Sequence, residues 1–267
     1  MPSGSSKSYG TYVALAAGAA AVTYAGTYGY KSRIERHYND GIDLNNQTVE
    51  IDPIEHIRRC TFYKDIDIYT HHKTICPNVQ TLGDVFINGY RLSNNGPCIA
   101  YVDLANEASP LHWTSYGIAL ERIRFIGSHL WTDLRLTPMK SVVAIISVNR
   151  PEYSFVENAC YNYGFIVLAL YTTYNTETIL SVLEKTQAEV LVIDELERIQ
   201  GYKDQLLEKK FLKEILVMDP VDSVENEKIK NIPTILRTMQ QSDVRPRPEV
   251  DPDSVATFIL TSGTTGS

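Results

Sequence analysis

The stretch Val142-Val143-Ala144-Ile145-Ile146-Ser147-Val148 gives the clearest indication of the fold, because all but one of its side chains are apolar and several are β-branched. Such a continuous apolar run favours a buried strand over a helix. After this stretch, Pro151 and Glu152 suit the first turn of a helix, and Gly164 can end that helix. A second apolar run, from Phe165 to Tyr171, follows at once. The stretch therefore predicts a strand, a helix and a second strand.

The same alternation continues along the chain. Asn175 or Thr176 can cap a further helix, and Val190–Asp194 and Ile215–Asp219 predict two more strands. Strands that are apolar throughout and separated by helices are typical of a parallel sheet covered on both faces. We therefore expect an α/β fold.

Shorter elements are predicted upstream. Thr81–Phe86 begins a short amphipathic helix, and Cys98–Val102 and Leu111–Thr114 indicate two antiparallel strands. Ser115 can cap a helix whose apolar residues recur at helical spacing until Pro138. Downstream, residues 220–230 are acidic and irregular, and a helix is expected around Ile235–Met239.

A stiff, proline-rich connector at residues 245–252 leads to Val255–Leu260, which we interpret as a buried strand. Directly after it comes Thr261-Ser262-Gly263-Thr264-Thr265-Gly266-Ser267. The glycines let successive N–H groups point one way, and the hydroxyls add donors, so the loop is suited to phosphate oxygens. The alternative is a solvated Ser/Thr/Gly tail. A Walker loop is excluded because no lysine follows the second glycine.

Residues 261–266 resemble the first six letters of the T-S-G-T-T-G-x-P-K-G phosphate loop of the adenylate-forming acyl-CoA synthetases. Residues 81–267 resemble the long-chain fatty acyl-CoA synthetase branch in the same order. The segments that carry this resemblance are Thr81–Phe86, Ser93–Cys98, Trp113-x-Ser115-Tyr116, Asn149-Arg150-Pro151-Glu152 and Leu170-Tyr171. The chain departs from the family pattern at Tyr153, where tryptophan is usual, and at Thr172 and Tyr174-Asn175. These departures weaken inference about the substrate.

The resemblance implies that residues 81–267 are an incomplete AMP-binding domain of a long-chain fatty acid–CoA ligase. Its chemistry would use ATP, Mg²⁺ and CoA to convert a fatty acid to acyl-CoA through an acyl-adenylate. Thr261, Ser262, Gly263, Thr264, Thr265 and Gly266 would hold the ATP phosphates, and no catalytic or metal-binding residue is expected in this chain. We expect Pro-Lys-Gly in frame after Ser267, and an isolated chain that is poorly soluble, inactive and weak in ATP binding.

Composition supports a globular protein of 267 residues with 43% hydrophobic and 21% charged residues. A net charge of −7 with no basic block argues against nucleic-acid binding. Cys60, Cys76, Cys98 and Cys160 lack C-x-x-C spacing and are expected to be reduced thiols. His71 and His72 near Cys76 lack a second ligand pair, so a metal site is not expected there.

Residues 1–31 contain an uncharged stretch, Tyr9–Tyr30, that is long enough to cross a bilayer as a hydrophobic helix. Lys31, Arg33 and Arg36 follow it, which predicts a membrane anchor with its C-terminal side in the cytoplasm. A signal peptide and a flexible alanine-rich leader are the alternatives. Residues 32–80 are interpreted as a linker and entry segment.

Two other functions remain open at this stage. The chain could be a catalytically dead, membrane-tethered interaction fragment, which would bind a partner without turnover. The strand–helix alternation also allows a dinucleotide-binding oxidoreductase, but no G-x-G-x-x-G follows any predicted strand.

Overall fold

The computed structural model describes residues 45–61, 64–65, 76–102, 111–221 and 226–260. The chain divides into two units, residues 1–71 and 72–267, and each is described by itself. The predicted membrane anchor at Tyr9–Tyr30 and the loop at residues 261–267 lie outside the described residues. Within the described ranges, no helix combines the length and apolar character needed to cross a bilayer.

The first unit contains an antiparallel hairpin of β1 (Thr48–Asp52) and β2 (Ile57–Cys60). Asp52 closes its turn, because Oδ1 accepts hydrogen bonds from the N–H groups of Ile54 at 2.8 Å and Glu55 at 3.1 Å. These N–H groups lower the pKa of Asp52. This hairpin was not predicted, because its mostly exposed residues lack the alternation that marks a half-buried strand.

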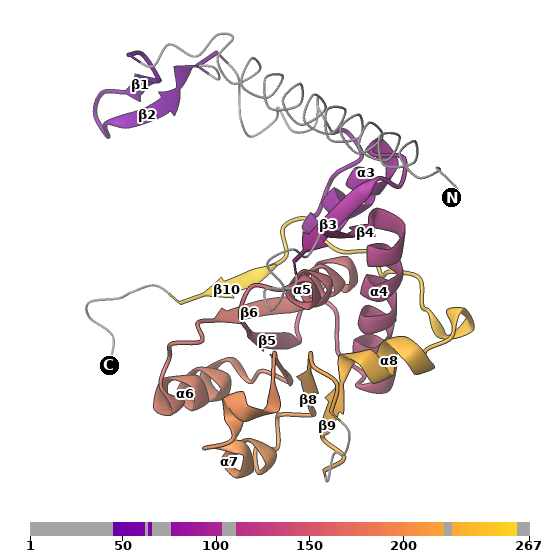
Figure 1. Cartoon of the computed structure of the whole chain (residues 1–267). Coiled ribbons are helices and arrows are strands. Elements are labelled where there is room, and N and C mark those ends of the chain that lie inside the picture. The colour runs from indigo at the N-terminus through magenta and orange to yellow at the C-terminus, as the bar shows by residue number, and fades with distance from the viewer. Residues whose placement is uncertain (1–44, 62–63, 66–75, 103–110, 222–225, 261–267) are drawn as a thin grey trace, which may run out of the picture. The chain divides into compact units, whose positions relative to one another are not determined.

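The second unit is built on a six-stranded sheet in the order β10-β6-β5-β7-β8-β9, in which every neighbouring pair is parallel (Figure 1). The strands are β5 (Val142–Ile146), β6 (Ile166–Leu170), β7 (Val190–Ile193), β8 (Glu214–Val217), β9 (Ile229–Asn231) and β10 (Thr257–Ile259). The four consecutive strands predicted from the sequence are confirmed. The short β9 was not predicted, because three residues are too few to show a period.

Side chains alternate between the two faces of the sheet, and each face carries its own core. Val143 and Ile145 of β5 face one core, whereas Ala144 and Ile146 face the other. Every residue of β5 is buried. The predicted parallel sheet covered on both faces is therefore confirmed.

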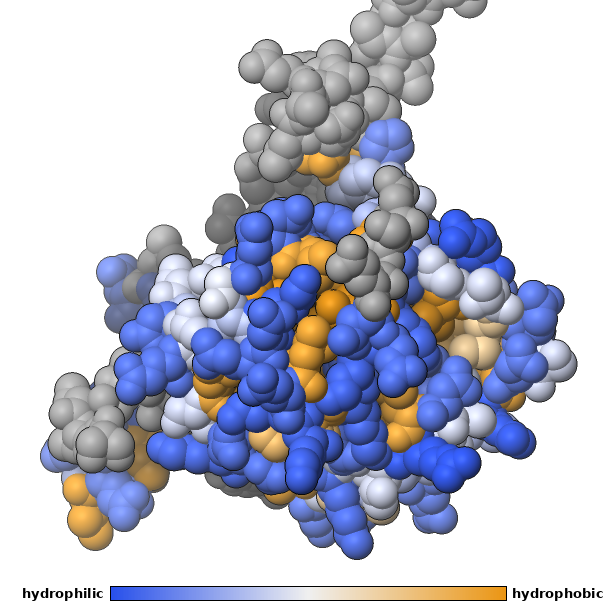
Figure 2. All heavy atoms as spheres, turned by 90° about the horizontal axis from the view of Figure 1, so that it is seen from below, coloured by the Kyte–Doolittle hydropathy of each residue, from blue (hydrophilic) through white to orange (hydrophobic). Residues whose placement is uncertain are grey.

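Helices α4 (Tyr116–Ser128), α5 (Pro151–Tyr163) and α8 (Ile232–Thr238) cover the first face. Helix α6 (Thr176–Thr186), the 3₁₀ turn η3 (Leu196–Ile199) and α7 (Lys203–Leu207) cover the second (Figure 1). Figure 2 views the molecule from below, where α6 and α7 lie in Figure 1, and shows a mostly hydrophilic face with apolar side chains between the polar ones. This polar exterior fits helices that bury only one stripe.

The helix ends follow the predicted signals. Pro151 occupies the first turn of α5, and Gly164 ends that helix with φ of 74°, a left-handed conformation that favours glycine. Asn175 caps α6, because its side-chain oxygen accepts a hydrogen bond from the N–H of Thr178 at 2.8 Å.

A smaller layer adjoins α4 and α5. It consists of α3 (Leu82–Leu92) and the antiparallel pair β3 (Pro97–Tyr101) and β4 (His112–Ser115), as predicted. Ser115 caps α4 by accepting a hydrogen bond from the N–H of Ile118 at 3.4 Å.

The α4 helix does not continue to Pro138 as predicted. It ends at Ser128 and passes into a π-helical turn, η2 (His129–Asp133). The wider turn places His129 and Leu130 in the interior. The change was not predicted, because a pattern of apolar residues cannot distinguish a single π turn from an α turn.

Candidate functional site

Strand β10 delivers the chain to the predicted phosphate loop. It lies at one edge of the sheet with Thr257, Phe258 and Ile259 opposite Val167, Leu168 and Ala169 of β6. Because β10 is parallel to the other strands, the chain leaves it at the carboxyl ends of the sheet, where open α/β sheets bind ligands. Residues 261–266 themselves lie outside the described residues.

The predicted burial of this strand is wrong in part. Phe258 is 37% exposed and Ile259 is 70% exposed. The described structure pairs β10 with β6 alone, and an edge strand covered on one side keeps solvent contact on the other.

One side-chain contact ties β10 to α5. Tyr161 Oη lies 3.0 Å from Thr257 Oγ1, and Tyr161 also donates to Glu157 at 3.3 Å. Burial raises the pKa of Tyr161 to about 12, so its hydroxyl stays protonated at neutral pH. The start of β10 is thus held both by the backbone ladder and by a helix behind it.

The order of the strands creates a switch point near the middle of the sheet. The chain passes from β5 to β6 on one side and then crosses to β7 on the other side of β5. The crossover helices of such a pair leave a crevice at the carboxyl ends of the two strands. Polar side chains directly after β5 and β7 would therefore lie beside this crevice.

Asp194, directly after β7, joins the two loops at this switch point. Its side chain is almost completely buried, and Oδ2 accepts hydrogen bonds from the N–H of Val148 at 3.0 Å and from Arg198 Nη2 at 2.7 Å. Oδ1 accepts from the N–H of Glu195 at 3.0 Å and from Arg198 Nε. Burial alone would raise the pKa of Asp194, but the hydrogen bonds from Arg198 and the two N–H groups outweigh it and hold the pKa below its usual value.

A second set of ion pairs ties the same loop to β8. Arg150 Nη2 lies 2.9 Å from Asp219 Oδ1, and Arg150 Nε lies 2.8 Å from Glu152 Oε2. Burial opposes the charge on Arg150, but the two carboxylates outweigh it and raise its pKa. Each arginine is therefore already paired, so these residues shape the loops after β5, β7 and β8.

The connector before β10 is fastened to the helices it crosses. Ser128 Oγ accepts a hydrogen bond from the N–H of Arg245 at 3.0 Å, and Tyr163 Oη donates to the carbonyl of Arg245 at 2.8 Å. Arg247 Nη2 then lies 2.6 Å from Asp84 Oδ1 at the start of α3. These contacts fix the path by which the chain enters the edge of the sheet.

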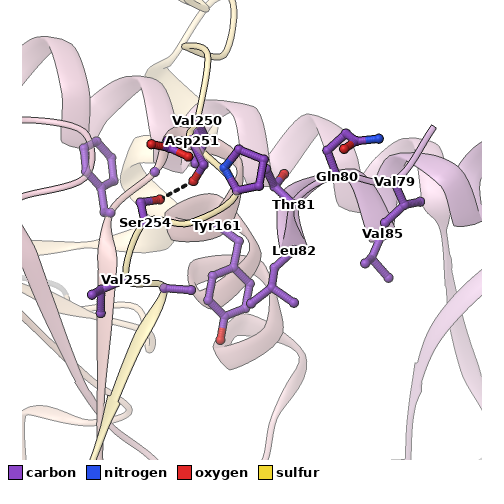
Figure 3. A pocket seen from close by; sticks show the side chains of 14 residues that line it. Val79, Gln80, Thr81, Leu82, Val85, Tyr161, Val250, Asp251, Ser254 and Val255 are labelled. Atoms are coloured by element: carbon purple, nitrogen blue, oxygen red, sulfur yellow. Dashed lines mark hydrogen bonds between the residues drawn. The ribbon is translucent and has the colours of Figure 1, made fainter. Parts of the chain in front are cut away.

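A small hollow lies beside this connector (Figure 3). It has a volume of about 260 Å³, and Leu82, Val85, Tyr161 and Val255 are among its lining residues. Residues 250–256 precede β10, so the hollow lies at the amino end of that strand. It is therefore at the opposite end of β10 from the predicted phosphate loop.

The remaining sequence predictions concern metal ligands and cysteines. In the part of the chain that the structure describes, no three His, Cys, Asp or Glu side chains gather as a metal site would require. All four cysteines are free thiols, as predicted. The roles of Asp194 and Arg150 were missed, although an acidic residue directly after a buried strand is a signal that could have found Asp194 and Asp219.

Comparisons with known proteins agree with this geometry. A family model described as AMP-binding enzyme matches residues 94–267. The chain is 30% identical over 238 residues to long-chain-fatty-acid–CoA ligase 5 of Mus musculus, covering 84% of this chain and 33% of the relative. It is 31% identical over 234 residues to long-chain-fatty-acid–CoA ligase 1 of Cavia porcellus, and the match covers 84% of this chain and 32% of that relative. The chain thus spans about a third of the length of these curated relatives.

Solved structures show the same fold. The acyl-CoA synthetase of Brucella canis matches with a TM-score of 0.60 at 13% identity, over 75% of this chain and 35% of that one. The anthranilate CoA ligase AuaEII, solved in complex with anthranoyl-AMP, matches with a TM-score of 0.58 at 14% identity. This match covers 72% of this chain and 34% of that one. The resemblance to the long-chain fatty acyl-CoA synthetases is confirmed by the curated relatives. The family model matches more than half of the length of this chain, and the chain therefore belongs to the family of AMP-binding enzymes.

Proposed function

We propose that this chain forms the N-terminal part of a long-chain fatty acid–CoA ligase and that residues 261–266 hold the phosphates of ATP. The observation that carries the proposal is the position of β10. This strand runs parallel to β6 at the edge of the sheet, so the chain leaves it at the carboxyl ends of the strands, which supports the proposal. The curated relatives of the chain supply the reaction class.

In the proposed reaction, a fatty carboxylate attacks the α-phosphorus of ATP to give an acyl-adenylate and diphosphate, and the thiol of CoA then displaces AMP. Mg²⁺ would neutralise charge on the phosphates. The proposed loop would orient the phosphates with N–H and hydroxyl donors. It consists of Thr261, Ser262, Gly263, Thr264, Thr265 and Gly266. They would act as neither nucleophile nor base.

The described residues would support this task by holding the neighbouring loops. Asp194 bridges the loops after β5 and β7, and Arg150 ties the first of these to Asp219 after β8. Paired side chains at this edge keep the loops in one arrangement without placing an unpaired charge beside a nucleotide.

We propose that the 267-residue chain by itself binds ATP weakly and does not turn over, because in the family the adenine, ribose and metal contacts come from later segments. The chain would then act alone only as an interaction fragment. A titration of the purified chain with a fluorescent ATP analogue tests this point, and we expect no saturation at micromolar concentrations. Micromolar affinity would contradict it.

The ligase proposal is tested by reading the coding sequence beyond Ser267, where we expect Pro-Lys-Gly in frame. A stop codon there in mature message would remove the enzymatic proposal. If the frame continues, the longer product is assayed for fatty-acid-dependent AMP formation.

A matched pair of serine variants then tests the loop in that longer product. Ser262→Ala removes a proposed phosphate donor, so we expect kcat/KM to fall about tenfold or more. Ser242→Ala removes an exposed hydroxyl in the 3₁₀ turn η4 (Gln241–Asp243) and should leave kcat/KM unchanged. Equal effects of the two substitutions would contradict the assignment of the loop.

We also propose that Tyr9–Tyr30 anchors the protein in a membrane, with the residues after Lys31 on the cytoplasmic side. The support is the uncharged stretch followed by basic residues. We expect the protein to stay in the membrane pellet after carbonate extraction and to be cleaved by protease added to the cytoplasmic face. Release by carbonate would contradict the anchor.

A further inference from the structure

A buried histidine joins the π turn η2 to the start of β8. His129 is only 3% exposed, and both of its ring nitrogens face carboxylates. Nδ1 lies 2.8 Å from Asp133 Oδ2, and Nε2 lies 2.6 Å from Glu214 Oε1 at the start of β8. Both distances are those of strong hydrogen bonds.

The charge of the ring follows from which groups carry the protons at these two contacts. An ionised carboxylate can only accept a hydrogen bond, and a neutral imidazole carries a single N–H. Two donating nitrogens beside two ionised carboxylates therefore require an imidazolium. With both carboxylates ionised, the two contacts need one proton more than a neutral histidine supplies.

The cluster extends to the edge strand. Glu214 is 2% exposed, and its second oxygen lies 2.8 Å from Lys230 Nζ on β9. The series Asp133, His129, Glu214 and Lys230 thus alternates in charge when the ring is protonated. Loss of the proton leaves the two carboxylates with only one cation, and one of those carboxylates is buried.

The remaining charged groups nearby do not replace the imidazolium. Lys213, next to Glu214, pairs with Glu189 Oε2 at 2.5 Å and donates to the carbonyl of Leu134 at 3.1 Å. Asp243 of η4 lines the same hollow as His129, and it adds negative charge. The residues of α8 that line this hollow are uncharged: Thr234, Ile235 and Thr238.

Solvent can reach the cluster to exchange the proton. A hollow of about 500 Å³ is lined by His129, Asp133 and Lys230, and the last two are 53% and 46% exposed. The ring itself is buried, but its partners face water. Protonation can therefore follow the pH of the medium without unfolding of the domain.

We propose that Asp133, His129, Glu214 and Lys230 form a proton-operated clamp that fastens β9 and the following α8 to the π turn, and that this edge of the sheet loosens when His129 is deprotonated. The clamp joins segments that are 85 residues apart in the sequence, from η2 to β8. Strand β9 has three residues and, among the described strands, pairs with β8 alone.

The direction of the pH effect follows from the state of His129. Burial alone would lower its pKa, but the hydrogen bonds and charges of Glu214 and Asp133 outweigh burial and raise the pKa above its ordinary value. The stabilisation is complete below about pH 6.5, the pKa of an unfolded histidine, and is lost as the pH rises through the higher folded value.

Amide hydrogen exchange of the whole chain between about pH 6 and pH 8.5 tests the clamp without any substitution, because this range spans the ordinary pKa of histidine. Protection factors of Ile215–Val217 and Ile229–Asn231 are compared with those of Val142–Ile146 in the sheet centre. Each unit by which the folded pKa exceeds the unfolded one corresponds to a tenfold loss of relative protection at high pH. An equal change of protection with pH in the β8–β9 amides and in the β5 amides would overturn the proposal.

Glu214→Gln supplies the second test, because it keeps the shape of the side chain and removes its charge. We expect the pH dependence of the β8–β9 amides to disappear and the NMR titration of the His129 ring to move to lower pH. A titration of His129 at or below that of an exposed histidine in the wild-type chain would overturn the clamp even if the variant does not fold.

A matched control lies in the hairpin of the first unit. His56 Nδ1 is 3.0 Å from Glu50 Oε1, but His56 is 82% exposed. Glu50→Gln should therefore leave both the exchange of β8–β9 and the His129 titration unchanged. An equal effect of Glu50→Gln and Glu214→Gln on the β8–β9 amides would show that a general charge effect, and not the clamp, is responsible.

Discussion

Gly127 of α4 lies so close to the ring of Tyr163 in α5 that a Cβ at position 127 would be 2.2 Å from Tyr163 Cδ2. The ring has no room to retreat, because Tyr163 is fully buried and its hydroxyl donates to the carbonyl of Arg245 at 2.8 Å. The two helices can approach each other only because residue 127 has no side chain.

Gly127→Ala should therefore destabilise the domain by about 2 kcal/mol through overpacking. Urea unfolding followed by circular dichroism measures this change. Gly201→Ala is the matched control, because a Cβ there has no heavy atom within 4 Å, and its effect should stay within about 0.5 kcal/mol. Similar midpoints for the two variants would contradict the packing argument.

The contact between Tyr161 and Thr257 should stabilise the edge strand that leads to the predicted loop. We expect Tyr161→Phe and Thr257→Val each to speed hydrogen exchange of Thr257–Ile259, with little change in β7 and β8. A double-mutant cycle on unfolding free energy should give a coupling of about 0.5–1.5 kcal/mol, the usual net value of one hydrogen bond. Strict additivity of the two substitutions would show that the hydroxyls do not interact.

Asp194→Asn should cost about 3 kcal/mol at neutral pH, because it leaves Arg198 and two N–H groups facing a neutral amide. The folded pKa of Asp194 is depressed, so the stabilisation is present above the unfolded pKa of about 3.9 and is lost as the pH falls through the lower folded value. Wild-type stability should consequently fall more steeply below about pH 4 than that of the variant.

Urea unfolding between about pH 2 and pH 7 measures this difference, since the range covers the ordinary pKa of an aspartate. Glu249→Gln, at an exposed position of the connector, is the control and should follow the wild-type curve. If Asp194→Asn also followed the wild-type curve, the buried ion pair would not contribute to folding.

The ion pair between Arg247 and Asp84 should respond differently to its two possible substitutions. Arg247→Gln removes a partly exposed pair and should cost about 0.5–1 kcal/mol. Asp84→Asn should cost more, about 1–2 kcal/mol, because Asp84 Oδ2 also accepts hydrogen bonds from the N–H groups of Gln80 and Thr81 at the start of α3.

Raising the salt concentration separates the two contributions, because salt screens the ion pair but not the backbone hydrogen bonds. The cost of Arg247→Gln should shrink at high salt, whereas most of the cost of Asp84→Asn should remain. Lys210→Gln, at an exposed position on the other side of the sheet, controls for the loss of a positive charge. Equal salt dependence of the two test variants would contradict the assignment.

Local patterns in the sequence were sufficient for most elements of the second unit. The apolar runs at Val142–Ile146 and Val190–Ile193 predicted strands, Gly164 predicted a helix end, and Asn175 predicted a cap. Each of these signals depends on a few neighbouring residues, whose backbone preferences do not change much with context.

The candidate site was predictable only in part. The strand before residue 261 and the phosphate loop at residues 261–266 could be predicted, because an apolar run favours a strand and glycine and hydroxyl residues after it suit phosphate oxygens. The residues that shape the neighbouring loops were not, because Asp194 meets Val148 and Arg150 meets Asp219 only after the strands have been ordered side by side.

An α/β domain of parallel strands could be predicted from the sequence alone, because the strand and helix periods depend on the local spacing of apolar residues. Three features could be seen only in the folded chain: β10 joins the edge of the sheet beside β6, a π turn follows α4, and His129 contacts Glu214. These outcomes depend on pairing between segments distant in the chain, and the free energy of such pairing comes from burial and charge that no single segment contains.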